Sequence, residues 1–274
     1  MKKNVSKVLF TFLVLSMALN TLYAQGPYVN LNVGYGFKMS SQNISFLSFE
    51  NTTSGANSNT YEQIDVSLGK GLNIGGAIGY MFNKNIGAEL GVSYLIGSKY
   101  EAKDEYVGGV RDFTLSAKML RINPTLVIAS GFENFNPYAK FGVVIGSGSI
   151  LYEISDNDQV DLYEAEIVFN GGLALGLTSG VGAMYTLNKM FSIYGELNMI
   201  NLSYAPKIGE FTKATLNGAD ELLDMTTNEK EIEFVDKYTK STSGTPNDSE
   251  PEKILRQRIP FGSLGLNIGV NFRF

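Results

Sequence analysis

The feature that most constrains the fold is a strict two-residue alternation in the last twelve residues, SLGLNIGVNFRF (263–274). Small, polar or charged residues fill every second place. The apolar places hold Leu264, Leu266, Ile268, Val270, Phe272 and Phe274. A frayed chain end would gain nothing from this register, so we expect the segment to be paired within a sheet whose two faces meet different surroundings.

The same alternation recurs along the chain in segments of about ten residues, which is a strand period and not a helical one. The seven further segments are 28–39, 71–82, 85–97, 119–129, 137–146, 172–186 and 191–204. Together with 263–274 they predict an all-β fold with eight long strands.

The composition of the two strand faces predicts that they are inverted relative to a soluble protein. The non-apolar face is rich in Gly, Ala, Asn and Ser, as suits a narrow interior, whereas the apolar face is continuous on all eight segments. A tilted strand needs roughly ten residues to cross a bilayer, and a sheet in a bilayer must close on itself because no water is there to satisfy a free edge. The pattern favours a closed transmembrane barrel; the alternative is a soluble β-sandwich.

The connections between these segments alternate in length. Three are short (83–85, 130–136 and 187–190), and four are long (40–68, 97–113, 147–167 and 204–260). Short turns on one side and long loops on the other are typical of outer-membrane barrels. We therefore predict an up-and-down antiparallel barrel with short periplasmic turns and long extracellular loops.

The N-terminal residues carry an export signal. A basic stretch with Lys2, Lys3 and Lys7 precedes the apolar run 8–19, and Ala24 offers a cleavage site before Gln25. This pattern predicts a signal peptide over 1–24 and a mature barrel domain over 25–274, with the long loop 204–260 before the last strand. The mature chain keeps 19 basic against 27 acidic residues, which argues against nucleic-acid binding.

At this point the sequence resembles the small eight-stranded outer-membrane barrels of the OmpA/OmpX-like porin family. The resemblance rests on GAELGVSY, RINPTLV, PYAKFGVVIG, GVGAMYTLNKMFSIYGELNMI and the terminal GLNIGVNFRF. It implies that barrel-insertion machinery reads a C-terminal signal formed by Leu266, Ile268, Val270, Phe272 and Phe274. It further implies a Gram-negative outer membrane, with lipid, lipopolysaccharide and periplasmic chaperones as partners.

Enzymatic chemistry is not expected. The chain contains no His and no Cys, so a Ser nucleophile lacks its usual base and a zinc site lacks its usual ligands. The glycine clusters match neither a dinucleotide nor a phosphate-loop spacing. We predict no catalytic residue, no cofactor and no metal.

Six charged residues fall on the predicted interior face: Lys38, Glu89, Arg121, Lys140, Glu196 and Arg273. They form either a structural plug, in which Glu89 and Glu196 are held by Arg121, Lys140 and Arg273, or a gate for small ions. The plug is favoured because eight strands leave an interior only wide enough for side chains.

The sequence thus predicts a monomeric, non-enzymatic outer-membrane barrel that contributes to envelope structure and, through its loops, to surface interaction. Two alternatives stay open. One is a narrow channel for ions or very small solutes, and the other is an adhesin or ligand-binding surface protein with an unidentified ligand.

Overall fold

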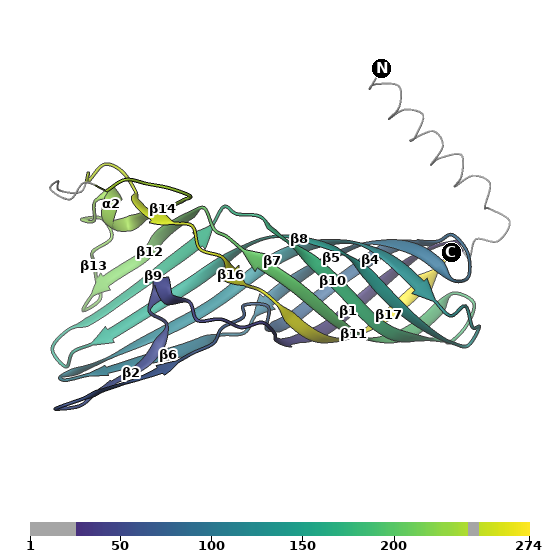
Figure 1. The fold of residues 1–274 in the computed structure, drawn as a ribbon, viewed down its shortest axis with the longest axis horizontal. Coiled ribbons are helices and arrows are strands. Elements are labelled where there is room, and N and C mark those ends of the chain that lie inside the picture. Colours follow the sequence, from purple (N-terminus) through teal and green to yellow (C-terminus); the bar gives the residue numbers. More distant parts are fainter. Residues whose placement is uncertain (1–25, 241–246) are drawn as a thin grey trace, which may run out of the picture.

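The computed structural model describes residues 26–240 and 247–274, and the predicted signal peptide lies outside them. All strands belong to one sheet (Figure 1). Among the described residues, no helix has the length and apolar character needed to cross a membrane.

Eight strands form a ring of hydrogen-bonded neighbours. Their bounds are β1 (Gly26–Lys38), β4 (Gly71–Met81), β5 (Ile86–Gly97), β7 (Gly109–Ala129), β8 (Phe135–Asn157), β10 (Ala174–Thr186), β11 (Phe191–Tyr204) and β17 (Ser263–Arg273). Each pairs antiparallel with the next, and β17 pairs with β1, where Val29 lies opposite Phe272 and Phe37 opposite Leu264. Each of the eight predicted segments overlaps one of these strands, with ends that differ by at most two residues where the segment is the longer.

Asparagine side chains shape the short turns at one end of the ring. Asn83 Oδ1 accepts hydrogen bonds from the backbone N–H groups of Asn85 and Ile86 at 2.8 and 2.9 Å. Asn188 does the same for Met190 and Phe191, both at 2.9 Å. An Asn side chain that mimics a turn in this way reverses the chain in few residues. The C-terminus lies at this same end, which we call the turn end (Figure 1).

The long connections contain regular structure, so the prediction of loops there needs correction. The region 97–113 holds β6 (Tyr100–Tyr106) and the start of β7, and 147–167 holds the end of β8 and the start of β9 (Leu162–Asn170). The region 204–260 contains β12 (Ile208–Leu216), β13 (Ala219–Asp220), the short helix α2 (Thr227–Lys230), β14 (Glu231–Val235), β15 (Glu252–Leu255) and β16 (Ile259–Pro260). These elements continue the wall beyond the ring (Figure 1).

The strands β7 and β8 change the polarity of their faces part-way along their length, and β7 shows this most clearly. On β7, the outward places hold Leu120, Ile122, Leu126 and Ile128 near the turn end but Asp112, Thr114, Ser116 and Lys118 farther out. The inward places change in the opposite sense, from Arg121, Asn123 and Thr125 to Phe113, Leu115, Ala117 and Met119. The far part of the wall therefore has the polar-outside, apolar-inside order of a soluble sheet. The prediction rested on strands with an apolar outer face, so it did not include this part.

The segment 40–68 was expected to be a long loop, and this is wrong for part of it. It contains the 3₁₀ turn η1 (Ser45–Leu47) and the strands β2 (Glu50–Ser54) and β3 (Asn59–Gln63). Ile44, Phe49, Val66 and Leu68 are buried in a cluster with inward side chains of the wall, which we call the far cluster. Four apolar side chains spaced irregularly along a polar segment show no period, so their common burial was not visible in the sequence.

Polar contacts join the strands near the far end of the wall. Tyr106 Oη donates a hydrogen bond to Asp156 at 2.6 Å, and Arg111 Nε donates to the same carboxylate at 2.8 Å. Because the Tyr106 hydroxyl donates to an anion, the hydrogen bond with Asp156 raises the pKa of Tyr106 to about 12. Side chains of β6, β7 and β8 are thereby tied together.

Candidate functional site

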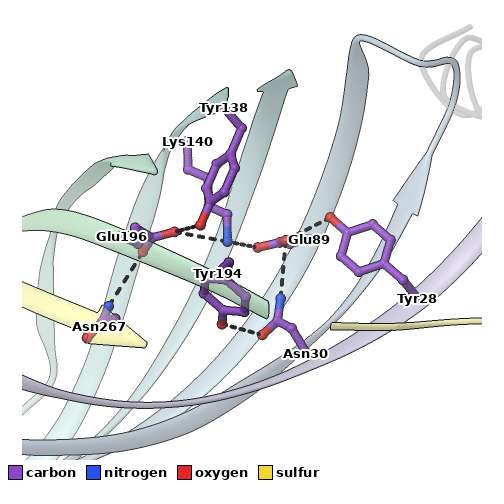
Figure 2. A network of polar contacts seen from close by, with 8 residues as sticks. All are labelled: Tyr28, Asn30, Glu89, Tyr138, Lys140, Tyr194, Glu196 and Asn267. Carbon is purple, nitrogen blue, oxygen red and sulfur yellow. Dashed lines mark hydrogen bonds and ion pairs between the residues drawn. The ribbon is translucent and has the colours of Figure 1, made fainter. Parts of the chain in front are cut away.

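The candidate site lies inside the ring, in the space that we call the lumen. Lys140 projects inward from β8 between Glu89 of β5 and Glu196 of β11 (Figure 2). Its Nζ lies 2.9 Å from Glu89 Oε2 and 3.2 Å from Glu196 Oε2. The three side chains are 15%, 7% and 10% exposed, so this is a largely buried ion cluster, which we call the lumen triad.

Neighbouring side chains donate further hydrogen bonds to the two carboxylates. Tyr28 Oη and Asn30 Nδ2 donate to Glu89 Oε1 at 2.7 and 3.2 Å. Tyr138 Oη donates to Glu196 Oε2 at 3.0 Å, and Asn267 Nδ2 approaches Glu196 Oε1 at 3.5 Å (Figure 2). A buried ion pair is stable only when its spare lone pairs find such donors.

Two tyrosine rings also line the cation. Lys140 Nζ lies 5.1 Å from the ring centroid of Tyr138 and 5.6 Å from that of Tyr194, within the range of a cation–π contact. The interpretation of the sequence missed Tyr28, Asn30, Tyr138, Tyr194 and Asn267. Each occupies an inward place of its strand, so strand parity was the signal that could have found them.

The other three predicted charges do not join the triad. Lys38 is exposed, and its Nζ is 3.5 Å from the Asp65 carbonyl oxygen. Arg273 Nη2 lies 3.4 Å from Met184 Sδ, near the turn end. Arg121 is fully buried, and Nη1 donates to Asn73 Oδ1 at 3.1 Å, while its Nε and Nη2 have no protein partner. Of the cations expected to hold Glu89 and Glu196, Lys140 alone does so.

Along the axis of the ring, apolar side chains lie on both sides of the triad. Toward the turn end lie Tyr28, Met81, Val127, Ala129, Tyr138 and Tyr194, with Met184 packed against them. In the other direction the inward side chains Leu95, Met119, Val144 and Ile200 belong to the far cluster. Glu89, Lys140 and Glu196 therefore lie between two apolar layers.

A polar chamber of about 90 Å³ adjoins the triad. Its lining includes Asn30, Asn32, Asn73, Asn123, Asn198 and Asn267. One water needs roughly 10–15 Å³ of such space and several polar partners, so the chamber can hold several waters. Asn73, which lines the chamber, accepts the hydrogen bond from Arg121.

The described residues contain no grouping of His, Cys, Asp or Glu that could hold a metal ion. In the triad, Lys140 is the cation that both carboxylates contact. Lys140 thus compensates part of the negative charge of Glu89 and Glu196 and links β5, β8 and β11 across the lumen.

The chain matches the family model described as outer membrane protein beta-barrel domain over residues 8–224. Among solved structures, CarO of Acinetobacter baumannii aligns with 13% identity and a TM-score of 0.31, covering 90% of this chain and 97% of that one. CarO2 of the same organism aligns with 11% identity and a TM-score of 0.31, covering 90% and 99%. Among curated proteins there is no significant match.

Proposed function

The chain belongs to the outer membrane protein β-barrel domain family, and on this premise we propose that its eight-stranded ring is a closed up-and-down barrel spanning the outer membrane. The mature protein comprises residues 25–274. The turn end faces the periplasm, and the extended wall faces the outside. The protein is a non-enzymatic monomer that contributes to envelope structure and surface interaction.

The polarity change along β7 supports this placement. Apolar side chains face outward from Leu120 to Ile128, and polar ones from Asp112 to Lys118. The outward side chains of β8 change at the same border, from Phe141, Val143 and Ile145 to Ser147 and Ser149. A bilayer requires an apolar outer surface for roughly 9–11 residues of a strand, and water requires a polar one. The change thus marks the outer border of the hydrocarbon.

The observation that carries the structural role is the position of Lys140. Its ammonium group bridges two carboxylates across the lumen, and apolar layers cover the bridge on both sides. An ion crossing the lumen would have to displace Lys140 from both carboxylates and then pass the apolar side chains Leu95, Met119, Val144 and Ile200. If the barrel is sealed, surface interaction must take place on the wall outside the membrane. This part of the wall contains β2, β3, β6, β9 and β12–β15.

We expect purified, refolded protein to give no conductance steps in a planar bilayer. Heat-shifted mobility on a gel would first establish that the sample is folded, and a general porin inserted in the same way would show that pores are detectable. Steady, ion-selective openings that change in Glu89→Gln or Glu196→Gln would contradict the sealed barrel.

Those openings would support the second candidate, a narrow channel for ions or very small solutes. One observation favours it: the polar chamber beside the triad has room for water, and the buried Arg121 beside it has two nitrogens without a protein partner. A charged group with unmet hydrogen bonds is costly, and movement of Arg121 toward a carboxylate would relieve that cost.

The C-terminal strand supplies the proposed assembly signal, Leu266, Ile268, Val270, Phe272 and Phe274. These side chains lie on the outward face, and the Phe272 ring contacts those of Phe191 and Phe274 at centroid distances of 5.0 and 4.8 Å. The exposure of these side chains supports the proposal that insertion machinery and periplasmic chaperones read them during assembly, before lipid and lipopolysaccharide surround the barrel.

We expect Phe274→Ser to reduce the outer-membrane fraction severalfold in cells, while the purified variant refolds into detergent as well as the parent. Phe274 is 74% exposed, so its loss removes little packing. Phe132→Ser, at a 65% exposed turn position, is the matched control. Equal impairment of refolding and of cellular assembly would mean that Phe274 acts through stability instead.

A further inference from the structure

The outer face of the ring carries an open groove of about 800 Å³ that crosses β10, β11, β17 and β1 near the turn end. Its lining is almost wholly apolar and includes Ala183, Tyr185, Ile193, Gly195, Ile268 and Val270. The volume is within the range of roughly 300–1,000 Å³ that accommodates a drug-sized ligand.

A glycine creates the groove, and neither backbone nor packing requires a glycine there. Gly195 lies opposite Ala183 on β10 and Ile268 on β17, on the outward face. A Cβ on Gly195 would meet no atom within 4 Å, and its φ is not positive. Inward glycines such as Gly142 and Gly182 differ, because a Cβ there would come within 3 Å of a neighbouring strand. Among the glycines that the structure describes, only Gly195 has open space without a left-handed backbone.

The groove lies within the apolar band of the wall, which in the proposed membrane placement faces hydrocarbon. Its neighbours on the same face are exposed apolar side chains, including Ile193, Ile268 and Val270. The turn that joins the two groove strands β10 and β11 carries an exposed cation, Lys189. Lys189 lies in the turn immediately before β11, and Ile193 and Gly195 line the groove farther along that strand. The groove strands thus carry a cation on the turn side of the apolar lining.

We propose that the groove is a binding site for one phospholipid of the periplasmic leaflet, with an acyl chain over Gly195 and the phosphate near Lys189. Tyr185 completes the site, since an aromatic ring near the membrane surface contacts both chain and headgroup regions. The inference rests on the proposed transmembrane placement. It does not depend on whether the lumen conducts.

The test is native mass spectrometry of the folded protein in detergent, titrated with dipalmitoylphosphatidylglycerol. We expect one lipid to stay bound to the parent at low lipid excess. Gly195→Leu, which fills the groove, should reduce that occupancy at least fivefold, and Lys189→Gln should reduce it to a lesser degree. Ala139→Leu adds the same side chain at an outward position on β8 that does not line the groove, and it should bind as the parent does.

Equal lipid occupancy in the parent and in Gly195→Leu would overturn the proposal. Dimers of the parent that Gly195→Leu abolishes would also overturn it, because a second copy of the chain would then occupy the groove. Each variant must first show the heat-shifted mobility of the folded parent. A folded protein that binds no lipid refutes the site and leaves the placement in the membrane intact.

Discussion

Replacement of Lys140 with methionine is expected to lower the free energy of unfolding by about 3–5 kcal/mol, the cost of removing one partner from a buried ion pair. Methionine fills a similar volume but leaves Glu89 and Glu196 without their shared cation. Both carboxylates are at most 10% exposed, and water from the adjoining chamber supplies no positive charge to compensate them. The loss therefore comes from two buried negative charges rather than from a cavity.

Urea unfolding of the detergent-folded protein, followed by gel mobility, measures this effect. The triple variant Lys140→Met, Glu89→Gln, Glu196→Gln should recover most of the loss, because without the two carboxylates no buried negative charge needs Lys140. Lys253→Met is the control, since Lys253 pairs with Glu250 at 3.4 Å on the surface, where such pairs contribute roughly 0–1 kcal/mol. If Lys140→Met costs no more than Lys253→Met, the triad does not hold the lumen together.

The second large effect is expected at Phe49, which lies in a region that the sequence presents as a polar loop. Phe49 is fully buried, and its ring lies 6.4 Å from that of Tyr152 on the wall. Removal of a buried Phe side chain typically costs about 3–5 kcal/mol. We expect Phe49→Ala to release the segment 40–68 from the far cluster while the ring stays folded.

Amide hydrogen exchange would show this release. The backbone bonds between Gln42 and Val66, both at 3.0 Å, should lose their protection, whereas β4 and β5 should keep theirs. Tyr61→Ala removes an aromatic ring of the same segment that is 63% exposed and serves as the control. Equal loss of protection in segment and ring would show that the two unfold as one unit, contrary to this expectation.

The ring strands could be predicted from the sequence because, over about ten residues, each keeps its apolar side chains on one face and its small or polar side chains on the other. Where the surroundings change, as on β7 between Lys118 and Leu120, the alternation continues with its polarity reversed, so the predicted strand stopped too early. The burial of Ile44, Phe49, Val66 and Leu68 could not be predicted, because it depends on the concave inner surface of the wall, and no local period expresses that shape.

For the site, strand parity placed Glu89, Lys140 and Glu196 on one face but could not fix their heights along the barrel. Height depends on strand tilt and on the stagger between neighbouring strands, which are properties of the closed ring. For this reason Arg121 and Arg273, with the same parity, were grouped with the triad, although they lie elsewhere in the lumen.

The pairing of β17 with both β11 and β1 has a consequence for quality control during assembly. Every strand that β17 joins precedes it in the chain, so the ring cannot close until the eleven residues of β17 are available. A product truncated before Ser263 would present two unpaired edges, and hydrocarbon offers no partner for their backbone groups. Closure of the ring therefore tests whether synthesis has reached β17: a chain that lacks this strand cannot form the ring.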